Sequence, residues 1–483
     1  MYIGVDLGTS SLKLALVNEN GELIKEVTKK YHIYQPHNLW SEQDPNEWLK
    51  AMEDALIEIT NQYNNIKAIS FSGQMHGLVL LDKNDNVIRN CILWNDQRTY
   101  QEVDELNNNL GVDTILKETS NIMLTGVTAP KLLWVKNNEL ENFNKINKIM
   151  LPKDYLVYKL TNQHVTDVSD ASGTLFYNVK ENKYSKKIIK YLNITEQQLP
   201  KVLNSSSIVG KINNYYKQKL NLNNDVNIII GGADQALGAI ATNTLLPGQW
   251  SISLGTSGVI YTPVDKINLE NEKFHTFASA NNTYYYMGVT LSAANSLSWI
   301  KNILYENITY KEMFEKLDYN LQNDIIFLPY LNGERAPIND PFAQATFIGM
   351  NNNTNKEDLL KAVLEGVGFS FKQIINEFSK TQLPKINYIN IIGGGAQNDK
   401  WVQIIADILG VKLQTIQNNY GPSYGAALLA IKGNNPLKSL EELTNKNIKI
   451  SQTFYPNLNN YTYYNNKFLK YEKLYNAVKI YWK

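Results

Sequence analysis

The sequence predicts an α/β protein built from two related domains, with the boundary close to residue 245. Strand-like apolar runs alternate with helix-like segments in both halves of the chain. Asp6-Leu7-Gly8-Thr9-Ser10 near the start is also echoed by Ser253-Leu254-Gly255-Thr256-Ser257 past the middle. Because 483 residues are too many for one hydrophobic core, we place the two domains at residues 1–244 and 245–483.

Composition indicates an ordinary folded protein whose partner is a small molecule. Hydrophobic residues make up 43% of the chain, and 47 basic against 46 acidic residues give a net charge of +1. This balance offers no net attraction to nucleic acid or to an anionic membrane. Cys91 is the only cysteine, which excludes an intrachain disulfide and a cysteine metal cluster. With no signal-peptide pattern and no apolar run near the length of a membrane span, we expect a cytoplasmic protein.

The first element is a predicted β-hairpin, with apolar residues at 2–5 and 12–17 on either side of its tip. Gly8 can take a positive φ and lets backbone N–H groups approach an anion, while the hydroxyls of Thr9 and Ser10 add donors. Such a tip suits phosphate oxygens, although Gly-Thr-Ser is also a common turn sequence.

The second half repeats this hairpin at residues 249–262, with Gly255 and Thr256 at the tip. Because one tip occurs in each half, the pair favours a phosphate chain held between two related domains. Asp6 precedes the first tip, where Ser253 stands in the second. Asp6 is therefore either the single carboxylate that a phosphate-bound Mg²⁺ needs or an acid that stabilises the turn. Lys13, beyond the first tip, is predicted to be a solvated charge at a sheet edge.

A polar group follows a buried strand in the first half. After a helix near residues 45–60 and a strand at 66–71, the chain reads Gln74-Met75-His76-Gly77 and then enters an apolar run. Ligands collect at such strand ends in open α/β sheets. An amide, a soft apolar surface and an imidazole suit a polyol with one apolar face, although a lone histidine is more often structural.

A second polar cluster surrounds Trp94, whose indole could form an aromatic platform for a sugar. Asp96 has two interpretations: it pairs with Arg98, or it accepts hydrogen bonds from sugar hydroxyls. We favour the ion pair on the sequence alone.

Asp234 stands where a predicted strand at 225–230 gives way to a helix of small residues that runs through Ala241. One interpretation is a helix N-cap, and the other is a carboxylate that orients a hydroxyl nucleophile and takes its proton. The two are compatible, because capping and the helix dipole would keep the carboxylate ionised.

The second half continues with a helix at 356–378, a strand at 388–392, a Gly393–Gly395 tip and a helix at 400–409. Gly394 and Gly395 could pass close to a flat base and ribose, and Asn398 could cap the helix or touch the nucleotide.

The loop at 332–337 either lines the cleft between the domains or has an internal structural role for Glu334 and Arg335. No unpaired Arg or Lys adjoins residues 74–77 in the sequence, which argues against an acidic substrate.

Taken together, these motifs resemble the FGGY carbohydrate kinases over nearly the whole chain. The resemblance also rests on stretches at residues 39–45, 93–96, 126–134 and 151–155. It implies an actin-like pair of ribonuclease-H-type domains with ATP and Mg²⁺ in an interdomain cleft. It further implies a catalytic base at Asp234, and contacts to the sugar from Met75, His76 and their neighbours. The implied reaction is phosphorylation of a ketopentose, D-xylulose at O5. Dimers are frequent among relatives, although no residue of this sequence argues for one.

Some positions depart from the pattern of the resembled family: Ala233, Gln235, Ala345 and Gln397. These changes leave open the substrate detail and the nucleotide contacts. The alternatives are a kinase for ribulose, gluconate or glycerol and, from another class, an actin-like or chaperone-like assembly ATPase. The Gln74–Gly77 motif counts against the ATPase, because such a protein needs no sugar pocket.

Overall fold

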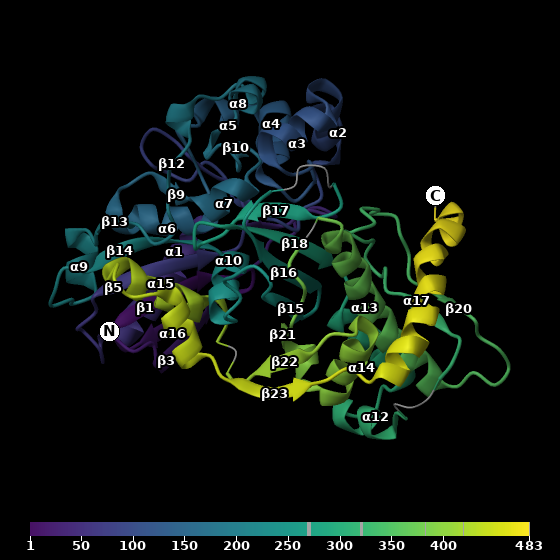
Figure 1. Ribbon diagram of the computed structural model, residues 1–483. Coiled ribbons are helices and arrows are strands. Elements are labelled where there is room, and N and C mark those ends of the chain that lie inside the picture. Colours follow the sequence, from purple (N-terminus) through teal and green to yellow (C-terminus); the bar gives the residue numbers. More distant parts are fainter. Residues whose placement is uncertain (268–271, 319–321, 382, 419, 483) are drawn as a thin grey trace.

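A computed structural model describes residues 1–267, 272–318, 322–381, 383–418 and 420–482. These residues form two α/β halves, each built around a mixed β-sheet with helices on its faces (Figure 1).

The described part of the first half contains a six-stranded sheet in the order β13-β14-β5-β1-β2-β3. Strands β1, β5 and β14 are parallel to one another, and β2, β3 and β13 are added antiparallel. The strands are β1 (Tyr2–Leu7), β2 (Ser11–Val17), β3 (Leu23–Lys30), β5 (Ala68–Gly73), β13 (Ile208–Lys211) and β14 (Asn227–Ala233).

The second half repeats this order and these directions. Its described residues form a seven-stranded sheet in the order β17-β18-β16-β15-β21-β22-β23, in which β17 is the extra strand. The two halves are therefore copies of one α/β plan, as the repeated hairpins predicted. The strands are β15 (Trp250–Leu254), β16 (Gly258–Val264), β17 (His275–Ala278), β18 (Tyr284–Thr290), β21 (Ile389–Ile392), β22 (Leu413–Ile416) and β23 (Ile450–Phe454).

Helices cover both sheets, and the first half carries an additional group of short helices and strands (Figure 1). The helices used below are α1 (Pro45–Thr60), α3 (Val112–Thr119), α6 (Pro152–Thr161), α7 (Val168–Gly173), α10 (Asp234–Ala241), α11 (Ala294–Leu304), α12 (Tyr310–Lys316), α13 (Lys356–Ser379), α14 (Asp399–Leu409), α15 (Gly421–Asn434), α16 (Leu440–Asn447) and α17 (Leu458–Val478). The other helices are α2 (Tyr100–Leu110), α4 (Thr128–Asn138), α5 (Leu140–Lys145), α8 (Lys186–Leu192) and α9 (Asn214–Lys219). The remaining short strands are β4 (Glu42–Gln43), β6 (Val79–Leu81), β7 (Cys91–Ile92), β8 (Lys148–Met150), β9 (Val165–Asp167), β10 (Tyr177–Asn178), β11 (Lys183–Tyr184), β12 (Lys201–Leu203), β19 (Ile326–Leu328) and β20 (Thr346–Ile348).

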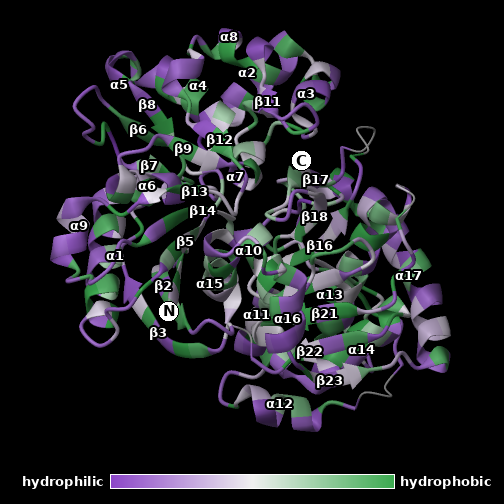
Figure 2. Ribbon diagram, turned by 60° about the vertical axis from the view of Figure 1, so that its left-hand side comes forward, coloured by the Kyte–Doolittle hydropathy of each residue, from purple (hydrophilic) through white to green (hydrophobic). Residues whose placement is uncertain are grey.

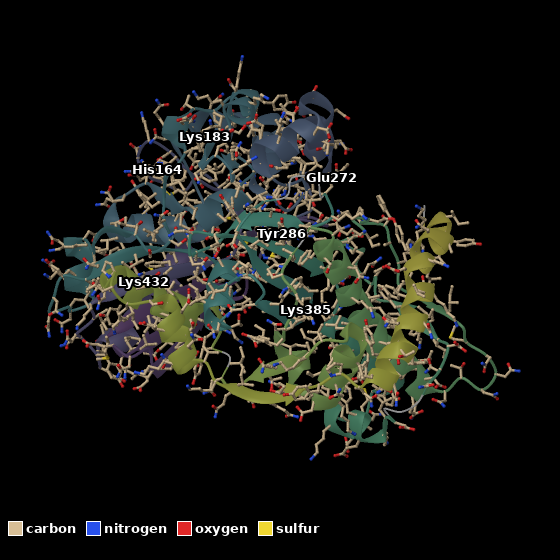
Figure 3. The ribbon with its side chains drawn as sticks, in the orientation of Figure 1. His164, Lys183, Glu272, Tyr286, Lys385 and Lys432 are labelled. Atoms are coloured by element: carbon tan, nitrogen blue, oxygen red, sulfur yellow. The ribbon has the colours of Figure 1, made fainter. Side chains whose placement is uncertain are left out.

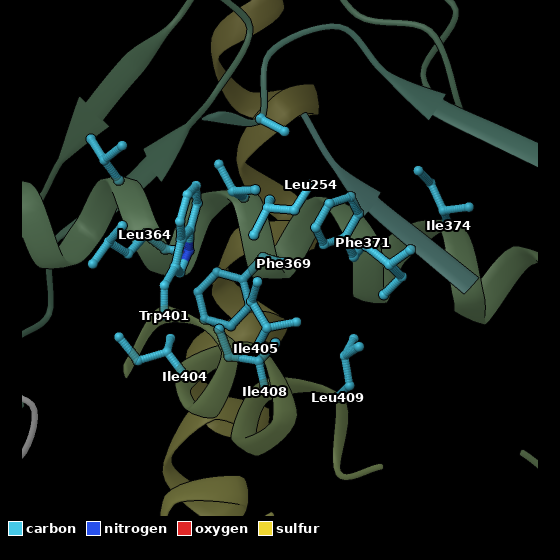
Figure 4. Close-up of a cluster of buried hydrophobic side chains, with 14 of the residues drawn as sticks. Leu254, Leu364, Phe369, Phe371, Ile374, Trp401, Ile404, Ile405, Ile408 and Leu409 are labelled. Atoms are coloured by element: carbon cyan, nitrogen blue, oxygen red, sulfur yellow. The ribbon is translucent and has the colours of Figure 1, made fainter. Parts of the chain in front are cut away.

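Each half has its own hydrophobic core. In the second half, α13 and α14 pack their apolar sides together beneath β15, with Phe371, Trp401 and Ile405 at the centre (Figure 4). The central strands of both sheets are mostly hydrophobic, whereas hydrophilic residues gather on the outer helices (Figure 2). Side chains follow the same division, because Tyr286 is 1% exposed inside the second half while Lys183 lies among the outer elements of the first (Figure 3).

Helix α15 belongs to the second half by sequence but packs on the sheet of the first. Its apolar residues join one buried cluster with β1, β14 and α10. The approach is so close that a Cβ on Gly4 of β1 would lie 1.9 Å from the carbonyl oxygen of Ser423. A Cβ on Gly425 of α15 would lie 2.0 Å from the carbonyl oxygen of Leu237 in α10. Glycine at both positions therefore lets α15 contact the two elements on which Asp6 and Asp234 stand.

The described elements follow the predicted ranges closely, with the helix at 45–60 matched end to end by α1. The strand predicted at 66–71 lies two residues later, at β5. Lys13 is exposed as predicted, but it is not at a sheet edge because β3 covers β2. Among the described residues, no helix combines the length and the apolar character needed to cross a membrane.

We expect Gly4→Ala to destabilise the protein by about 3 kcal/mol, because the new methyl group would meet backbone atoms that cannot move aside. Gly210→Ala is the matched control, since a Cβ at this β13 position meets nothing within 4 Å. Thermal unfolding would measure both variants. Equal midpoints for the two would contradict the packing described for α15.

Candidate functional site

The two Gly-Thr-Ser tips lie at the ends of β-hairpins, as predicted, and both turn their carbonyl groups toward the protein. At the second tip, the carbonyl of Gly255 accepts a hydrogen bond at 2.8 Å from the N–H of Ala294, the first residue of α11. The carbonyl of Thr256 accepts one at 2.9 Å from the N–H of Ala293, the N-cap of that helix. At the first tip, the hydroxyl of Tyr31 donates to the carbonyl of Gly8. Within the described residues, the N–H groups of Thr9, Ser10 and Thr256 donate to no protein group, so they are available to an anion.

Side chains from the first half hold the first tip in place. Gln43 Nε2 donates to the carbonyl of Thr9 at 2.6 Å, and the indole N–H of Trp94 donates to Thr9 Oγ1 at 3.0 Å. Gln74 is 1% exposed and donates to Gln43 Oε1 at 2.9 Å. Two residues that the sequence assigned to the sugar, Gln74 and Trp94, therefore support the first tip directly or through Gln43.

The third tip lies against the second. Gly393 has φ 99°, and a Cβ there would lie 2.7 Å from the backbone of Leu254, so glycine is required at this contact. Gly394 is exposed with open space around it, and Gly395 is buried against Leu254. Asn398 is the N-cap of α14, where its side chain accepts from Trp401 N at 2.9 Å. Of the two interpretations for Asn398, the capping role is the one observed.

Asp6 stands on β1 immediately before the first tip. It is 7% exposed and accepts a hydrogen bond from Ser72 Oγ at 2.8 Å. Burial raises the pKa of Asp6 to about 6, with Ser72 and Lys13 acting in the opposite direction. The described residues contain no group of three or more acidic, histidine or cysteine side chains that could hold a metal. One carboxylate beside two phosphate-type tips fits Mg²⁺, which keeps several waters and binds through few protein carboxylates.

Asp234 is the first residue of α10 and directly follows β14, and one strand, β5, lies between β14 and the β1 strand that carries Asp6. Ser72 on β5 is the register partner of Asp6 on β1 and of Gly232 on β14. A bulge at Gly231, with φ 78°, precedes this point, and a Cβ there would lie 1.7 Å from the carbonyl of Phe71. Asp234 thus enters the site from the carboxyl end of β14, beside Asp6.

Two expectations for Asp234 need correction. Its side chain is not the N-cap of α10, because the N-cap residue is Ala233 and no side-chain cap is formed. Nor does the helix keep the carboxylate fully ionised at neutral pH. Burial and the nearby Asp6 charge raise the pKa of Asp234 to about 7, although hydrogen bonds from Gln235 oppose them. The carboxylate of Asp234 is therefore a base poised near neutral pH.

A hydrogen-bond relay lies behind Asp234. Ala233 N donates to Ser169 Oγ at 2.9 Å, and Ser169 Oγ donates to Asp167 Oδ2 at 2.5 Å. Asp167 also accepts from Ser205 Oγ at 2.7 Å and lies 3.0 Å from Lys153 Nζ. This relay fixes the backbone at the start of α10 to the interior of the first half.

The relay ends in a buried charge cluster of Lys153, Asp154, Asp167 and Asp170. Lys153 Nζ lies 2.6 Å from Asp154 and 3.2 Å from Asp170, with all side chains fully or almost fully buried. Burial raises the pKa of Asp170 well above its ordinary value. Sequence reasoning missed this cluster, because its members are spread over 18 residues of α6, β9 and α7 and only the fold brings them together.

His76 and Met75 pack against α7. His76 Nδ1 lies 2.7 Å from the carbonyl of Gly173, and a Cβ on Gly173 would meet the imidazole at 2.9 Å and Met75 Cε at 3.1 Å. Burial, followed by the charge of Lys131, lowers the pKa of His76 to about 3, so the ring is neutral at pH 7. Because the carbonyl can only accept, Nδ1 carries the proton and Nε2 is left as an acceptor for a ligand hydroxyl.

Two cations lie close to His76, although the sequence placed none beside it. Lys131 Nζ donates to the carbonyls of His76 and Gly126, both at 2.8 Å. Arg335 reaches the same region from the second half, with Nη2 3.3 Å from the position that a Cβ on Gly126 would occupy. The sequence argument against an acidic substrate is therefore wrong in its premise, because residues distant along the chain meet here.

Asp96 forms the predicted ion pair. It is fully buried, and its oxygens accept from Arg98 Nε at 2.9 Å, Arg98 Nη2 at 2.7 Å and Ser41 N at 2.6 Å. Arg98 also lies 3.6 Å from the ring of Trp40. Both carboxylate oxygens are thus occupied by the protein, which makes Asp96 an anchor for the segment that carries Trp94.

The site has two chemically different ends. Asp6 and Asp234 form an acidic end beside the phosphate-type tips, where charge on one carboxylate disfavours charge on the other. His76, Lys131 and Arg335 form an end with one hydrogen-bond acceptor and two basic side chains, of which Lys131 has its pKa lowered to about 7 by burial. Such an arrangement can take a proton from a hydroxyl at the acidic end while holding the rest of a polar molecule at the other.

We expect Asp6→Asn to lower the pKa of Asp234 below about 7, because it removes a like charge that opposes ionisation. The carboxyl ¹³C chemical shift of Asp234, followed against pH without nucleotide or metal, would measure the change. Asp113→Asn is the control, since Asp113 is exposed on α3. An Asp234 titration that is the same in Asp6→Asn as in the control would contradict the coupling.

Comparisons with known proteins match this architecture. Residues 1–241 match the N-terminal domain of the FGGY family of carbohydrate kinases, and residues 250–433 match its C-terminal domain. A xylulose kinase of Staphylococcus xylosus is 38% identical over 98% of this chain and 99% of its own.

Two crystal structures from Lactobacillus acidophilus superpose equally well. A ligand-bound xylulose kinase has a TM-score of 0.94 at 28% identity, with 99% of this chain and 98% of the other covered. A gluconate kinase has the same score and identity, with 99% and 97% covered. Sugar kinases of this family use ATP. Both domains are thus present in order with the predicted motifs, and the chain belongs to the FGGY family of carbohydrate kinases.

Proposed function

We propose that the protein transfers the γ-phosphoryl group of ATP to the O5 hydroxyl of D-xylulose. The observation that carries this proposal is Asp234, a partly exposed carboxylate beside Asp6 at the acidic end of a site flanked by two phosphate-type tips. The Staphylococcus xylosus relative, a xylulose kinase that matches nearly end to end, supports the choice of sugar.

In this proposal the two tips and the third, Gly394-Gly395, bind the nucleotide through backbone N–H groups. Asp6 would hold Mg²⁺, which neutralises phosphate charge during transfer. The same cation would relieve the repulsion between Asp6 and Asp234, so nucleotide binding would favour the ionised form of Asp234.

Asp234 would then orient the sugar hydroxyl and accept its proton as the bond to phosphorus forms. A strong base is unnecessary, because the transition state is loose and most catalysis comes from position and charge stabilisation. Met75 would contact the apolar face of the sugar, and His76 Nε2 would accept from a hydroxyl. Gln74, Trp94 and Asp96 would act one step away, by holding the first tip and its neighbours.

A second candidate substrate is a sugar acid such as gluconate. Arg335 and Lys131 near His76 favour it, because a carboxylate would meet the Arg335 guanidinium there and would favour the charged form of Lys131, whose pKa is lowered to about 7. An assay of ADP release with D-xylulose, D-ribulose, D-gluconate and glycerol would separate these candidates. We expect D-xylulose to give the highest kcat/KM. A higher kcat/KM for D-gluconate would favour the second candidate, and turnover that needs no sugar would favour an assembly ATPase.

We expect Asp234→Asn to lower kcat by about two orders of magnitude or more while the affinity for ATP stays nearly unchanged. The amide cannot accept the hydroxyl proton, whereas the nucleotide-binding tips are untouched. A coupled ADP assay would measure kcat, and calorimetry would measure ATP binding. Near-normal turnover would remove Asp234 from the mechanism.

Stability provides a control for this variant. Because the pKa of Asp234 is raised to about 7 by folding, the folded protein loses stability as pH rises from about 4 through 7. Asp234→Asn should therefore unfold at a higher temperature than the wild type at pH 8, and the difference should shrink at pH 4. A variant that is less stable at pH 8 would point to misfolding as the cause of its lost activity.

A further inference from the structure

The loop at 332–337 brings the Arg335 guanidinium to Gly126, close enough for its charge to act on the pKa of His76. We define Met75, His76 and Gly173 as the sugar patch. Ala336 N donates to the carbonyl of Val289 at 2.9 Å, which fixes the loop to the end of β18. The loop thus belongs to the rigid part of the second half.

Glu334 holds the loop but does not pair with the side chain of Arg335. Its carboxylate accepts from Thr290 Oγ1 at 2.6 Å, Leu291 N at 2.9 Å and Arg335 N at 2.8 Å. Across the described residues, the Arg335 guanidinium forms no hydrogen bond and no ion pair with protein. Of the predicted pair, Glu334 therefore makes the side-chain hydrogen bonds that hold the loop, while the side chain of Arg335 interacts with Glu334 only through charge.

Arg335 is partly exposed and points toward the first half. Its Nη2 lies 3.3 Å from the position that a Cβ on Gly126 would occupy. Lys131 Nζ donates hydrogen bonds both to the carbonyl of Gly126 and to that of His76, so these two backbone segments lie close together. The charge of Arg335 also contributes to lowering the pKa of His76, of His275 and of Lys131.

Strand β17 of the second half completes this side of the patch. The ring of Phe277 lies 5.9 Å from that of His76 and 5.4 Å from that of His275. Asn121 of the first half secures β17 through hydrogen bonds with Thr276 at 2.6 and 2.9 Å. Arg335 therefore approaches the patch beside an interface between the halves.

Among the described residues, no carboxylate lies at hydrogen-bond distance from the Arg335 guanidinium. Burial lowers the pKa of Arg335, and the only charge that opposes this is that of the neighbouring Glu334. Burial lowers the pKa of both His76 and His275 to about 3, so their rings are neutral, and it lowers the pKa of Lys131 to about 7. At the acidic end, the charge of Asp6 raises the pKa of Asp234. Arg335 is not among the groups that change the pKa of Asp234. A planar guanidinium with unused donors, facing a polyol-type patch, is suited to oxygen acceptors.

We propose that Arg335 binds the carbonyl end of the sugar, across the site from Asp234, and so sets the direction in which the substrate lies. This inference rests on the proposed function and deepens it. A 2-ketopentose would place its C1 and C2 oxygens at Arg335 and its C5 hydroxyl at Asp234. The same contact would receive the carboxylate of a sugar acid, which explains how closely related folds serve both substrates.

The test compares Arg335→Gln and Arg335→Lys with Lys311→Gln, an exposed charge change on α12 of the same half. We expect Arg335→Gln to raise KM for D-xylulose about ten- to a hundredfold, the loss of one charge-assisted hydrogen bond, with KM for ATP within about twofold of wild type. Arg335→Lys should keep part of the affinity, and Lys311→Gln should match the wild type.

A direct binding measurement tests the position of the contact. Calorimetry without nucleotide would compare D-xylulose with xylitol, which has a hydroxyl in place of the carbonyl. Loss of Arg335 should weaken D-xylulose binding at least about threefold more than xylitol binding, because a carbonyl only accepts while a hydroxyl finds other partners. Equal weakening of both ligands, or an unchanged KM for D-xylulose, would overturn the inference.

The two proposals can fail separately. If the wild type does not phosphorylate D-xylulose, the proposed function fails. If the wild type does so and Arg335→Gln has the same KM and the same ligand affinities, only the role of Arg335 fails. A fall in thermal stability of Arg335→Gln relative to Lys311→Gln, with unchanged sugar binding, would assign Arg335 a structural role instead.

Discussion

The contact of α15 with β1 and α10 is the constraint on which the rest of the structure depends. Both carboxylates of the acidic end stand on elements that rest on this helix, Asp6 on β1 and Asp234 at the start of α10. The contact leaves no room for a Cβ at Gly4 or Gly425, so backbone meets backbone. Interiors packed to this density move as units, and small shifts are costly. The separation of the two acids is therefore set by helix packing, and α15 links it to the second half.

Desolvation of Asp6 and Asp234 raises their pKa values and so determines what these carboxylates can do chemically. The charge of Asp6 raises the pKa of Asp234 further. Among the described residues, neither acid has a cationic partner at hydrogen-bond distance. The protein tolerates this cost because the relay through Ser169 and Asp167 fixes the backbone ahead of Asp234. Functional groups kept in an unfavourable state by their surroundings are typical of catalytic sites. A bound cation would supply the positive charge that these two carboxylates lack.

The distribution of polar groups also explains why closely similar folds can serve different sugars. The phosphate-type tips offer backbone N–H groups, which are the same whatever side chains surround them. The opposite end uses side chains from both halves, with His76 from the first and Arg335 from the second. Substrate choice can thus change through a few side chains at that end while the acidic end and the tips remain constant. The equal likeness to a xylulose kinase and a gluconate kinase is consistent with this division.

The sequence by itself determined the fold class, the twin hairpins and the elements that carry Asp6, Asp234 and His76. These features are local, because strand alternation, helix periodicity and glycine tips depend on residues that are neighbours in the sequence. Tertiary structure alone decided which residues surround them. Gln74 and Trp94 support the first tip, and Asp96 accepts hydrogen bonds from Arg98. Arg335 comes from the other half and lies close enough to His76 to act on its pKa. The pKa of Asp234 also depends on burial and on Asp6, which its own helix does not reveal. Side-chain partners and desolvation arise from contacts between distant segments, and the sequence pattern does not encode which segments meet.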